Sequence, residues 1–210
     1  MIPDIATLGL FMAAAMLLLV IPGPVVVFVV ARSLDQGRLA GFVSVLGVHL
    51  GSTVHVTAAA VGLSALLVSS ADAFTVVKLF GAAYLAYLGI RRLMEKDRTI
   101  DVTDLKRAPL GTLFWQGCVV NILNPKTALF FLAFLPQFVD PARGSIALQI
   151  VFLGCVFILL GIVSDGFYAL IAGSLRGWVA RRPKALTVER YVSATTYLGL
   201  GVLTAFARRS

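Results

Sequence analysis

Charged residues are scarce in this chain. They make up 13% of its 210 residues, whereas 59% are hydrophobic, and ordinary soluble domains carry about 25% charged residues. This composition excludes a soluble globular protein. A helix needs about 20 apolar residues to cross a bilayer, and six such stretches can be drawn, at 5–31, 38–68, 72–93, 110–139, 145–175 and 189–207. We therefore predict an all-α polytopic membrane protein with a single transmembrane domain over residues 1–210.

Residues that catalyse reactions or bind metals are also few. The two cysteines, Cys118 and Cys155, are separated and flanked by apolar residues, and we interpret them as small core residues. His49 and His55 are about 600° apart around a helix, so they do not share a face as metal ligands would. We interpret both as hydrogen-bonded packing residues. No nucleophile, phosphate-binding loop or metal-ligand pattern is present, so we predict no enzyme, no cofactor and no metal site.

The basic residues lie mainly between the predicted spans. No Lys or Arg precedes the first apolar run, so we expect no cleaved leader and a retained first span. Eleven of the 18 Lys and Arg residues lie in the links 91–107 and 176–190. The positive-inside rule then makes the first, third and fifth links cytoplasmic and puts both termini outside. We read the net charge of +8 as this topological signal instead of a nucleic-acid surface, with anionic lipid as a weaker alternative.

The two halves of the chain show a weak internal repeat. Three pairs of residues share an offset of 103 positions: Pro22 and Pro125, Gly41 and Gly144, and Gly51 and Gly154. The repeat matches three spans to three spans, and an odd number of spans per half forces the halves into opposite orientations. We therefore predict two inverted three-helix repeats, over about 1–100 and 108–210, as in many secondary transporters.

Two proline motifs interrupt the apolar runs. Pro22-Gly23-Pro24 divides the first span, and Asn124-Pro125-Lys126, with Asn121 just before it, divides the fourth. Proline removes a helical hydrogen bond and leaves a carbonyl group without its donor. Helix amino ends at such breaks offer N–H groups to a carboxylate, and the unpaired carbonyls can accept from an ammonium. The two breaks predict a central binding site suited to a zwitterion, although each alone also fits a packing kink.

Lys126 is the one basic residue deep inside a predicted span. It can neutralise a substrate carboxylate, pair with an intramembrane acid or extend to the membrane surface, and the distance to the surface disfavours the last of these. Asp165 is the only carboxylate well inside a span. An intramembrane carboxylate is by default a candidate for proton or ion coupling, and the alternative is a fixed ion pair with Lys126. The sequence leaves these two roles open.

Other polar residues are candidates for lining a pathway. We include Ser52, Thr53, His55 and Gln116 in this group. Gly37, Gly41, Gly47 and Gly51 recur along the second span, where small residues allow helices to approach closely. Their spacing fits packing inside one chain, and it fits a homodimer as well.

These motifs together resemble the LysE/RhtB family of bacterial amino-acid exporters. The resemblance covers nearly the whole chain and includes Pro22-Gly23-Pro24, the glycines of the second span, Gly81-Ala82-Ala83-Tyr84-Leu85-Ala86-Tyr87-Leu88-Gly89, Asn124-Pro125-Lys126-Thr127-Ala128-Leu129-Phe130-Phe131, Leu135-Pro136-Gln137-Phe138 and Tyr168-Ala169-Leu170. One position departs from it. Many relatives carry an acidic or amide residue after the glycine corresponding to Gly51, and this chain has Ser52.

The resemblance implies an inner-membrane exporter of amino acids or derivatives such as homoserine, threonine or leucine, driven by protons. The interior residues favour a neutral amino acid among these substrates, because a dibasic amino acid would bring an extra positive charge toward Lys126. Pro22, Gly23, Pro24, Asn121, Asn124, Pro125 and Lys126 would bind the substrate, with Asp165 for coupling. Two alternatives remain, an exporter of divalent metal cations and a membrane protein that does not transport.

Overall fold

The computed structural model describes residues 3–69 and 107–174, with six isolated helical positions at 76, 79, 83, 87, 90 and 94; at 63–69 it describes the backbone alone. Every regular element in this part of the chain is helical, which confirms the predicted all-α class. The helices are α1 (Ile5–Val20), α2 (Pro24–Gln36), α3 (Arg38–Ser69), α5 (Leu110–Ile122), α6 (Pro125–Leu129) and α7 (Ile146–Ser174). A π-helical segment, Phe130–Phe134, and two 3-10 segments, Leu135–Phe138 and Pro141–Arg143, join α6 to α7.

Up to four membrane spans can be drawn in the described residues. Arg38–Gly62 and Ile146–Ser174 are each long and apolar enough alone. The other two are bent pairs: α1 and α2 meet at 54°, and α5 meets the segment Pro125–Phe138 at 48°. These four agree with the predictions at 5–31, 38–68, 110–139 and 145–175. The spans predicted at 72–93 and 189–207 lie outside the continuously described residues.

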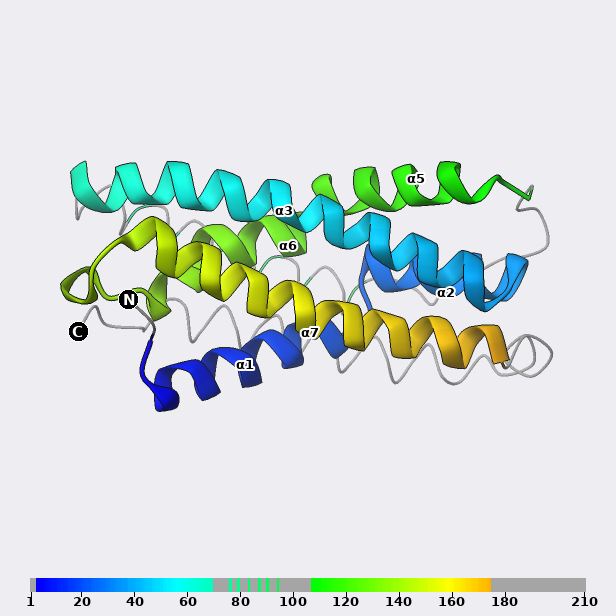
Figure 1. The fold of residues 1–210 in the computed structure, drawn as a ribbon, viewed down its shortest axis with the longest axis horizontal. Coiled ribbons are helices and arrows are strands. Elements are labelled where there is room, and N and C mark those ends of the chain that lie inside the picture. Colours follow the sequence, from blue (N-terminus) through cyan, green and yellow to red (C-terminus); the bar gives the residue numbers. More distant parts are fainter. Residues whose placement is uncertain are drawn as a thin grey trace.

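The helices divide the molecule into two ends and a middle. In Figure 1, α3 and α7 run most of its length, while α1 covers one end and α2 the other. The chain runs along α1 and α2 in one direction and returns along α3. In the second half, α5 and α6 run in the same direction as α3, and α7 runs in the opposite direction. Both breaks therefore lie in the middle of the long axis.

The first link is shorter than we predicted. Helix α2 continues to Gln36 and α3 begins at Arg38, so Gly37 alone connects them. Gly37 has a φ of 90°, a left-handed conformation that glycine adopts without the steric cost of a side chain. The prediction ended the first span at residue 31, but the polar residues that follow extend the same helix to Gln36.

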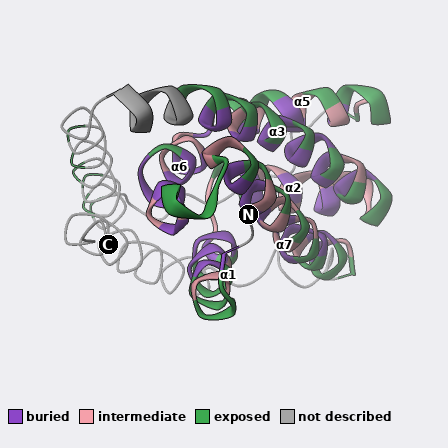
Figure 2. Ribbon diagram, turned by 60° about the vertical axis from the view of Figure 1, so that its left-hand side comes forward, coloured by how far each residue is buried: buried purple, intermediate pink, exposed green. Residues whose placement is uncertain are grey.

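Glycines bring α3 close to α5. A Cβ atom added at Gly51 would lie 2.6 Å from the carbonyl oxygen of Cys118, and one at Gly117 would lie 2.5 Å from that of Ser44. The predicted role of glycine in close packing inside the chain is confirmed here. Figure 2 shows buried positions where the helices face one another and exposed positions on their outer sides. Cys118 is buried as predicted, but Cys155 is exposed, so its prediction as a core residue is wrong.

Two hydrophobic clusters pack on either side of the breaks. The aromatic cluster joins α1, α3, the segment 130–138 and α7, and its aromatic members are Phe11, Phe130, Phe131, Phe134, Phe138 and Phe157. Its rings lie as close as 4.7 Å between centroids, for Phe130 and Phe157. The valine cluster joins α2, α3 and α7, and consists of Val25, Val29, Val45, Val48 and Ala169. The middle of the molecule is thus enclosed by apolar side chains from both directions.

Candidate functional site

The first break supplies backbone groups. Helix α1 ends at Val20, Ile21 is extended, and Pro24 is the first residue of α2. Because Pro24 has no N–H, the carbonyl of Val20 loses its helical donor, and the hydroxyl of Tyr168 donates to it instead at 2.6 Å. Gly23 precedes α2 without a side chain to cap its first amides. Those amides lie at the positive end of the helix dipole.

The second break supplies side chains. Asn124 precedes α6, and its Oδ1 accepts from the backbone N–H of Lys126 at 3.1 Å. Pro125 is the first residue of α6, where its missing N–H costs nothing. It therefore occupies the place that Pro24 has in the first break, so the structural counterpart of Pro125 is Pro24 and not Pro22.

Lys126 joins the two breaks. Its side chain is buried, and Nζ donates to the carbonyl oxygen of Ile21 at 2.6 Å. The break in the first helix leaves that carbonyl free to accept. The prediction that Lys126 does not extend to the membrane surface is confirmed by this burial and by this partner. We expected unpaired carbonyls at the first break to face a ligand, but Lys126 and Tyr168 hold two of them in this conformation.

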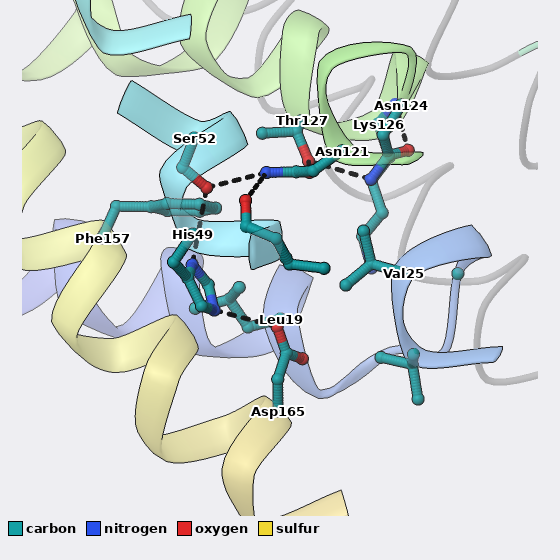
Figure 3. A pocket seen from close by; sticks show the side chains of 13 residues that line it. Leu19, Val25, His49, Ser52, Asn121, Asn124, Lys126, Thr127, Phe157 and Asp165 are labelled. Atoms are coloured by element: carbon teal, nitrogen blue, oxygen red, sulfur yellow. Dashed lines mark hydrogen bonds and ion pairs between the residues drawn. The ribbon is translucent and has the colours of Figure 1, made fainter. Parts of the chain in front are cut away.

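A small cavity lies where the breaks meet (Figure 3). Its volume is about 30 Å³, and it is lined from α1, α2, α3, α5, α6 and α7 by Leu19, Gly23, Val25, Val26, Val48, His49, Ser52, Asn121, Asn124, Lys126, Thr127, Phe157 and Asp165. A water molecule needs about 10–15 Å³ on this measure, and small-molecule sites usually reach about 300 Å³ or more. In this conformation the cavity is therefore too small for most small-molecule ligands. The aromatic cluster contributes Phe157 to its lining, and the valine cluster contributes Val25 and Val48.

Asp165 pairs with a histidine across this cavity. Its Oδ2 lies 3.1 Å from Nε2 of His49, and both side chains are almost fully buried. The pair bridges α7 and α3. Gly161, one turn before Asp165, makes room for the histidine, because a Cβ atom there would overlap the imidazole ring. The pairing of Lys126 with Asp165 stays a prediction, although both residues line the same cavity.

Asn121 is the centre of a buried polar network. Its Nδ2 donates to the carbonyl of Val48 and to Oγ of Ser52, each at 2.8 Å, and its Oδ1 accepts from Oγ1 of Thr127 at 2.9 Å. Asn124 in turn donates to Oγ1 of Thr127 at 2.9 Å. Every polar atom of the Asn121 side chain therefore has a partner, which removes much of the cost of burying it.

Three predicted pathway residues lie away from the cavity. Thr53 is exposed and donates to the carbonyl of Leu50 in its own helix. His55 contacts the backbone carbonyl of Asn121 at 2.9 Å and stacks on Phe131. Gln116 accepts from Arg32 at 3.1 Å and lines a separate open groove between α2 and α5. Of that group, Ser52 alone lines the central cavity.

The sequence analysis missed two residues of the site. His49 was interpreted as a packing residue, and it is hydrogen-bonded as predicted, but its partner is the intramembrane carboxylate. Thr127 links the two asparagines. A usable signal was present for Thr127, which follows Lys126 directly and is one turn beyond Asn124. Within the described residues, no group of three His, Cys, Asp or Glu side chains gathers as metal ligands do.

Comparison with known proteins agrees with this architecture. The model of the LysE type translocator family matches residues 16–208. The homoserine/homoserine lactone efflux protein of Salmonella typhimurium is 30% identical over 95% of this chain and 96% of the relative. The uncharacterized membrane protein YrhP of Bacillus subtilis is 30% identical over 92% and 96%, and the leucine efflux protein of Salmonella choleraesuis is 24% identical over 90% of each chain. No solved structure matches. The family match, across almost the whole chain, shows that this membrane protein belongs to the LysE type translocators, which are transporters and not enzymes.

Proposed function

We propose that this protein exports a small neutral amino acid or derivative, such as homoserine, threonine or leucine, from the bacterial cytoplasm in exchange for protons. The names of two relatives, a homoserine/homoserine lactone and a leucine efflux protein, support this substrate class. The observation that carries the proposal is the contact of Lys126 with Ile21, which joins two broken helices at a buried cavity.

The cavity offers complementary groups to a zwitterion. The amides at the start of α2 and the ammonium of Lys126 are the groups that attract a carboxylate. The carbonyl of Ile21 and the carboxylate of Asp165 attract an ammonium. Lys126 now occupies the carbonyl of Ile21, where a substrate ammonium would bind. Loading therefore requires Lys126 to leave this carbonyl and turn to the substrate carboxylate.

The mechanism we propose is alternating access. The valine cluster would open the cavity toward the cytoplasm, and the aromatic cluster would open it toward the outside. The directions of the described helices support the inverted repeat, because α1, α2 and α3 run opposite to α5, α6 and α7, respectively. The proposed topology includes two further spans, at 72–93 and 189–207, and places both termini outside.

Transport into inside-out membrane vesicles tests the function. The panel contains labelled homoserine, threonine, leucine, lysine and divalent metal ions, each with and without a protonophore. We expect protonophore-sensitive uptake of a neutral amino acid. Uptake of a metal ion and of no amino acid would replace the proposal by the metal alternative, and no uptake by correctly inserted protein would favour a protein that does not transport.

Substitution of Lys126 tests the site. Lys126→Ala removes the ammonium that we assign to the substrate carboxylate. Truncation of one partner of a buried charge pair costs about 2–5 kcal/mol, so we expect uptake to fall by about 30-fold or more. Arg143→Ala is the matched control, because Arg143 is an exposed basic residue that contacts Asp4 and Asp140. Equal transport by wild type and Lys126→Ala, at equal amounts of inserted protein, would exclude this cavity as the substrate site.

A further inference from the structure

The imidazole ring of His49 contacts a different partner with each of its two nitrogens. Nε2 of the imidazole lies 3.1 Å from Oδ2 of the carboxylate, and the other ring nitrogen, Nδ1, lies 3.4 Å from Oγ of Ser52. A buried carboxylate next to an imidazole can exist with one proton shared between them or with two. The two states differ by one unit of charge, carried by two side chains that are almost fully buried.

We assign the tautomer of His49 from the hydrogen-bond network around it. The amide of Asn121 donates to Oγ of Ser52, so the hydroxyl hydrogen of Ser52 is free to point at Nδ1 of His49. Nδ1 then accepts, and Nε2 donates to Asp165. In this state the pair carries one negative charge, and the lone pair of Nδ1 is the position where a second proton can bind.

The same network extends from the pair to the second break. It continues from Ser52 through Asn121 and Thr127 to Asn124, with hydrogen bonds of 2.8 to 2.9 Å. Asn124 caps the helix that carries Lys126. A proton at Nδ1 requires the hydroxyl of Ser52 to turn from donating to accepting, so that its oxygen then accepts from both His49 and Asn121. The protonation of His49 is therefore connected to the position of Lys126 by a continuous set of hydrogen bonds.

We infer that His49 and Asp165 form the proton-binding site of this transporter, and that the positive charge of the bound proton opposes binding of the substrate ammonium group beside Asp165. This inference rests on the proposed export of a zwitterionic amino acid. A proton taken from water on one side binds to Nδ1 of His49, no other bond changes, and the charge of the pair rises from −1 to 0. The same proton leaves to water on the opposite side.

Neighbouring charges fit this exchange. With one shared proton, the pair is negative and attracts the substrate ammonium while Lys126 holds the carboxylate. With the second proton bound, the pair is neutral and the ammonium loses its counter-charge. On the helices around the pair, the other ionisable groups of the described residues are Lys126 on α6, Cys155 and Tyr168 on α7, Arg38 and His55 on α3, Cys118 on α5, and Arg32 and Asp35 on α2. Of these, Lys126 lines the cavity.

Purified protein in liposomes tests the inference. Net uptake of labelled homoserine or leucine down its own concentration gradient needs no imposed proton gradient, and a pH-sensitive dye inside the vesicles reports the protons that move in exchange. For wild type we expect protons and amino acid to move in a fixed ratio, and the KM for uptake to rise by about tenfold for each unit that the pH falls once the second proton binds. For His49→Gln, which keeps a polar side chain but cannot take the proton, we expect this ratio to fall by about 5-fold or more and the KM to become independent of pH.

A second variant displaces the imidazole ring of His49 and leaves the histidine itself in place. Gly161→Ala adds a methyl group where the imidazole lies, so we expect the same loss of proton movement per amino acid. Gly62→Ala is its control, because a Cβ atom there meets nothing within 4 Å. If His49→Gln and Gly161→Ala both keep the wild-type ratio and pH dependence, the inference is wrong although export stands. If wild type shows no uptake of either amino acid, the proposed substrate class is wrong instead.

Discussion

The two helix breaks bend by similar angles, 54° and 48°, and each half-helix beyond the break begins with a proline, but they contribute different groups. The first break exposes carbonyls and uncapped amides of the main chain. The second break is capped by Asn124 and brings the side chains of Asn121, Thr127 and Lys126 into the middle of the molecule. Similar bends thus produce a site with backbone groups on one side and side chains on the other.

This difference matters because the two kinds of group tolerate change differently. The groups of the first break come from the path of the chain, so substitutions affect them only by changing that path. The groups of the second break depend on residue identity. We therefore expect substitutions near the second break to alter stability and substrate choice more strongly, and the following experiments test that asymmetry from the largest effect to the smallest.

Removal of Asn121 should have the largest effect on stability. Asn121→Ala leaves Ser52, Thr127 and the carbonyl of Val48 without their shared partner, and unsatisfied buried groups cost about 1–3 kcal/mol. We expect a loss of this size in the free energy of unfolding, measured in detergent. Gln116→Ala, which removes a contact to Arg32 alone, should cost less. Equal losses for the two variants would remove the basis for a side-chain network at the second break.

An exchange of caps should make the two breaks more alike. Gly23→Ser gives α2 a side-chain cap that competes for the amides we assign to the substrate carboxylate, so KM for transport should rise by about 3- to 10-fold, in line with a cap worth about 1 kcal/mol. Asn124→Gly removes the existing cap and the contact to Thr127, so it should lower the free energy of unfolding. An unchanged KM for Gly23→Ser would argue against binding of the carboxylate by α2.

Loss of the Tyr168 hydroxyl should have a smaller effect. Tyr168→Phe removes the donor to the carbonyl of Val20, and hydrogen bonds between membrane helices are worth about 0.6 kcal/mol on average. We expect a decrease of this order in the free energy of unfolding, with transport retained. If Tyr168→Phe proved as damaging as Asn121→Ala, the first break would depend on side chains as strongly as the second does.

The start of α1 provides the smallest expected effect and a third kind of cap. The backbone and hydroxyl of Thr7 donate to Asp4 and, with a contribution from Arg143, lower the pKa of its carboxyl below the ordinary value of 3.8. A lowered pKa in the folded state means stabilisation above the unfolded pKa, lost as pH falls through the lowered pKa. Wild type should therefore be slightly more stable than Asp4→Asn at neutral pH, and the two unfolding curves should converge in acid. A difference that persists below that pH would show that charge is not the cause.

The sequence analysis predicted the breaks correctly because their cause is local. A proline removes a hydrogen bond wherever it stands, and an excess of apolar residues implies membrane spans. The partners of the polar residues were not predictable in this way. Lys126 contacts a main-chain carbonyl 105 residues away in the sequence, and His49 contacts a carboxylate 116 residues away. Such contacts depend on how the helices pack against one another.

Two interpretations were limited by what the sequence does not show of neighbouring helices. The spacing of His49 from His55 tests for ligands on one helix, so it could not reveal a partner on another helix. Cys155 was judged by its apolar neighbours, but in a membrane protein apolar positions face lipid as well as the core, and Cys155 is exposed. In this class of protein, hydrophobicity indicates which residues lie in the membrane but not which side of a helix faces inward.

The link at Gly37 has a mechanical consequence for the site. It is a single residue between α2 and the long helix α3, and α2 has 13 residues, or about 20 Å at a rise of about 1.5 Å per residue. A rotation of about 10° at Gly37 therefore moves the start of α2 by about 3 Å, as much as the length of a hydrogen bond. A slight tilt at one end of the protein is in this way amplified into a displacement at the first break, large enough to separate Ile21 from Lys126.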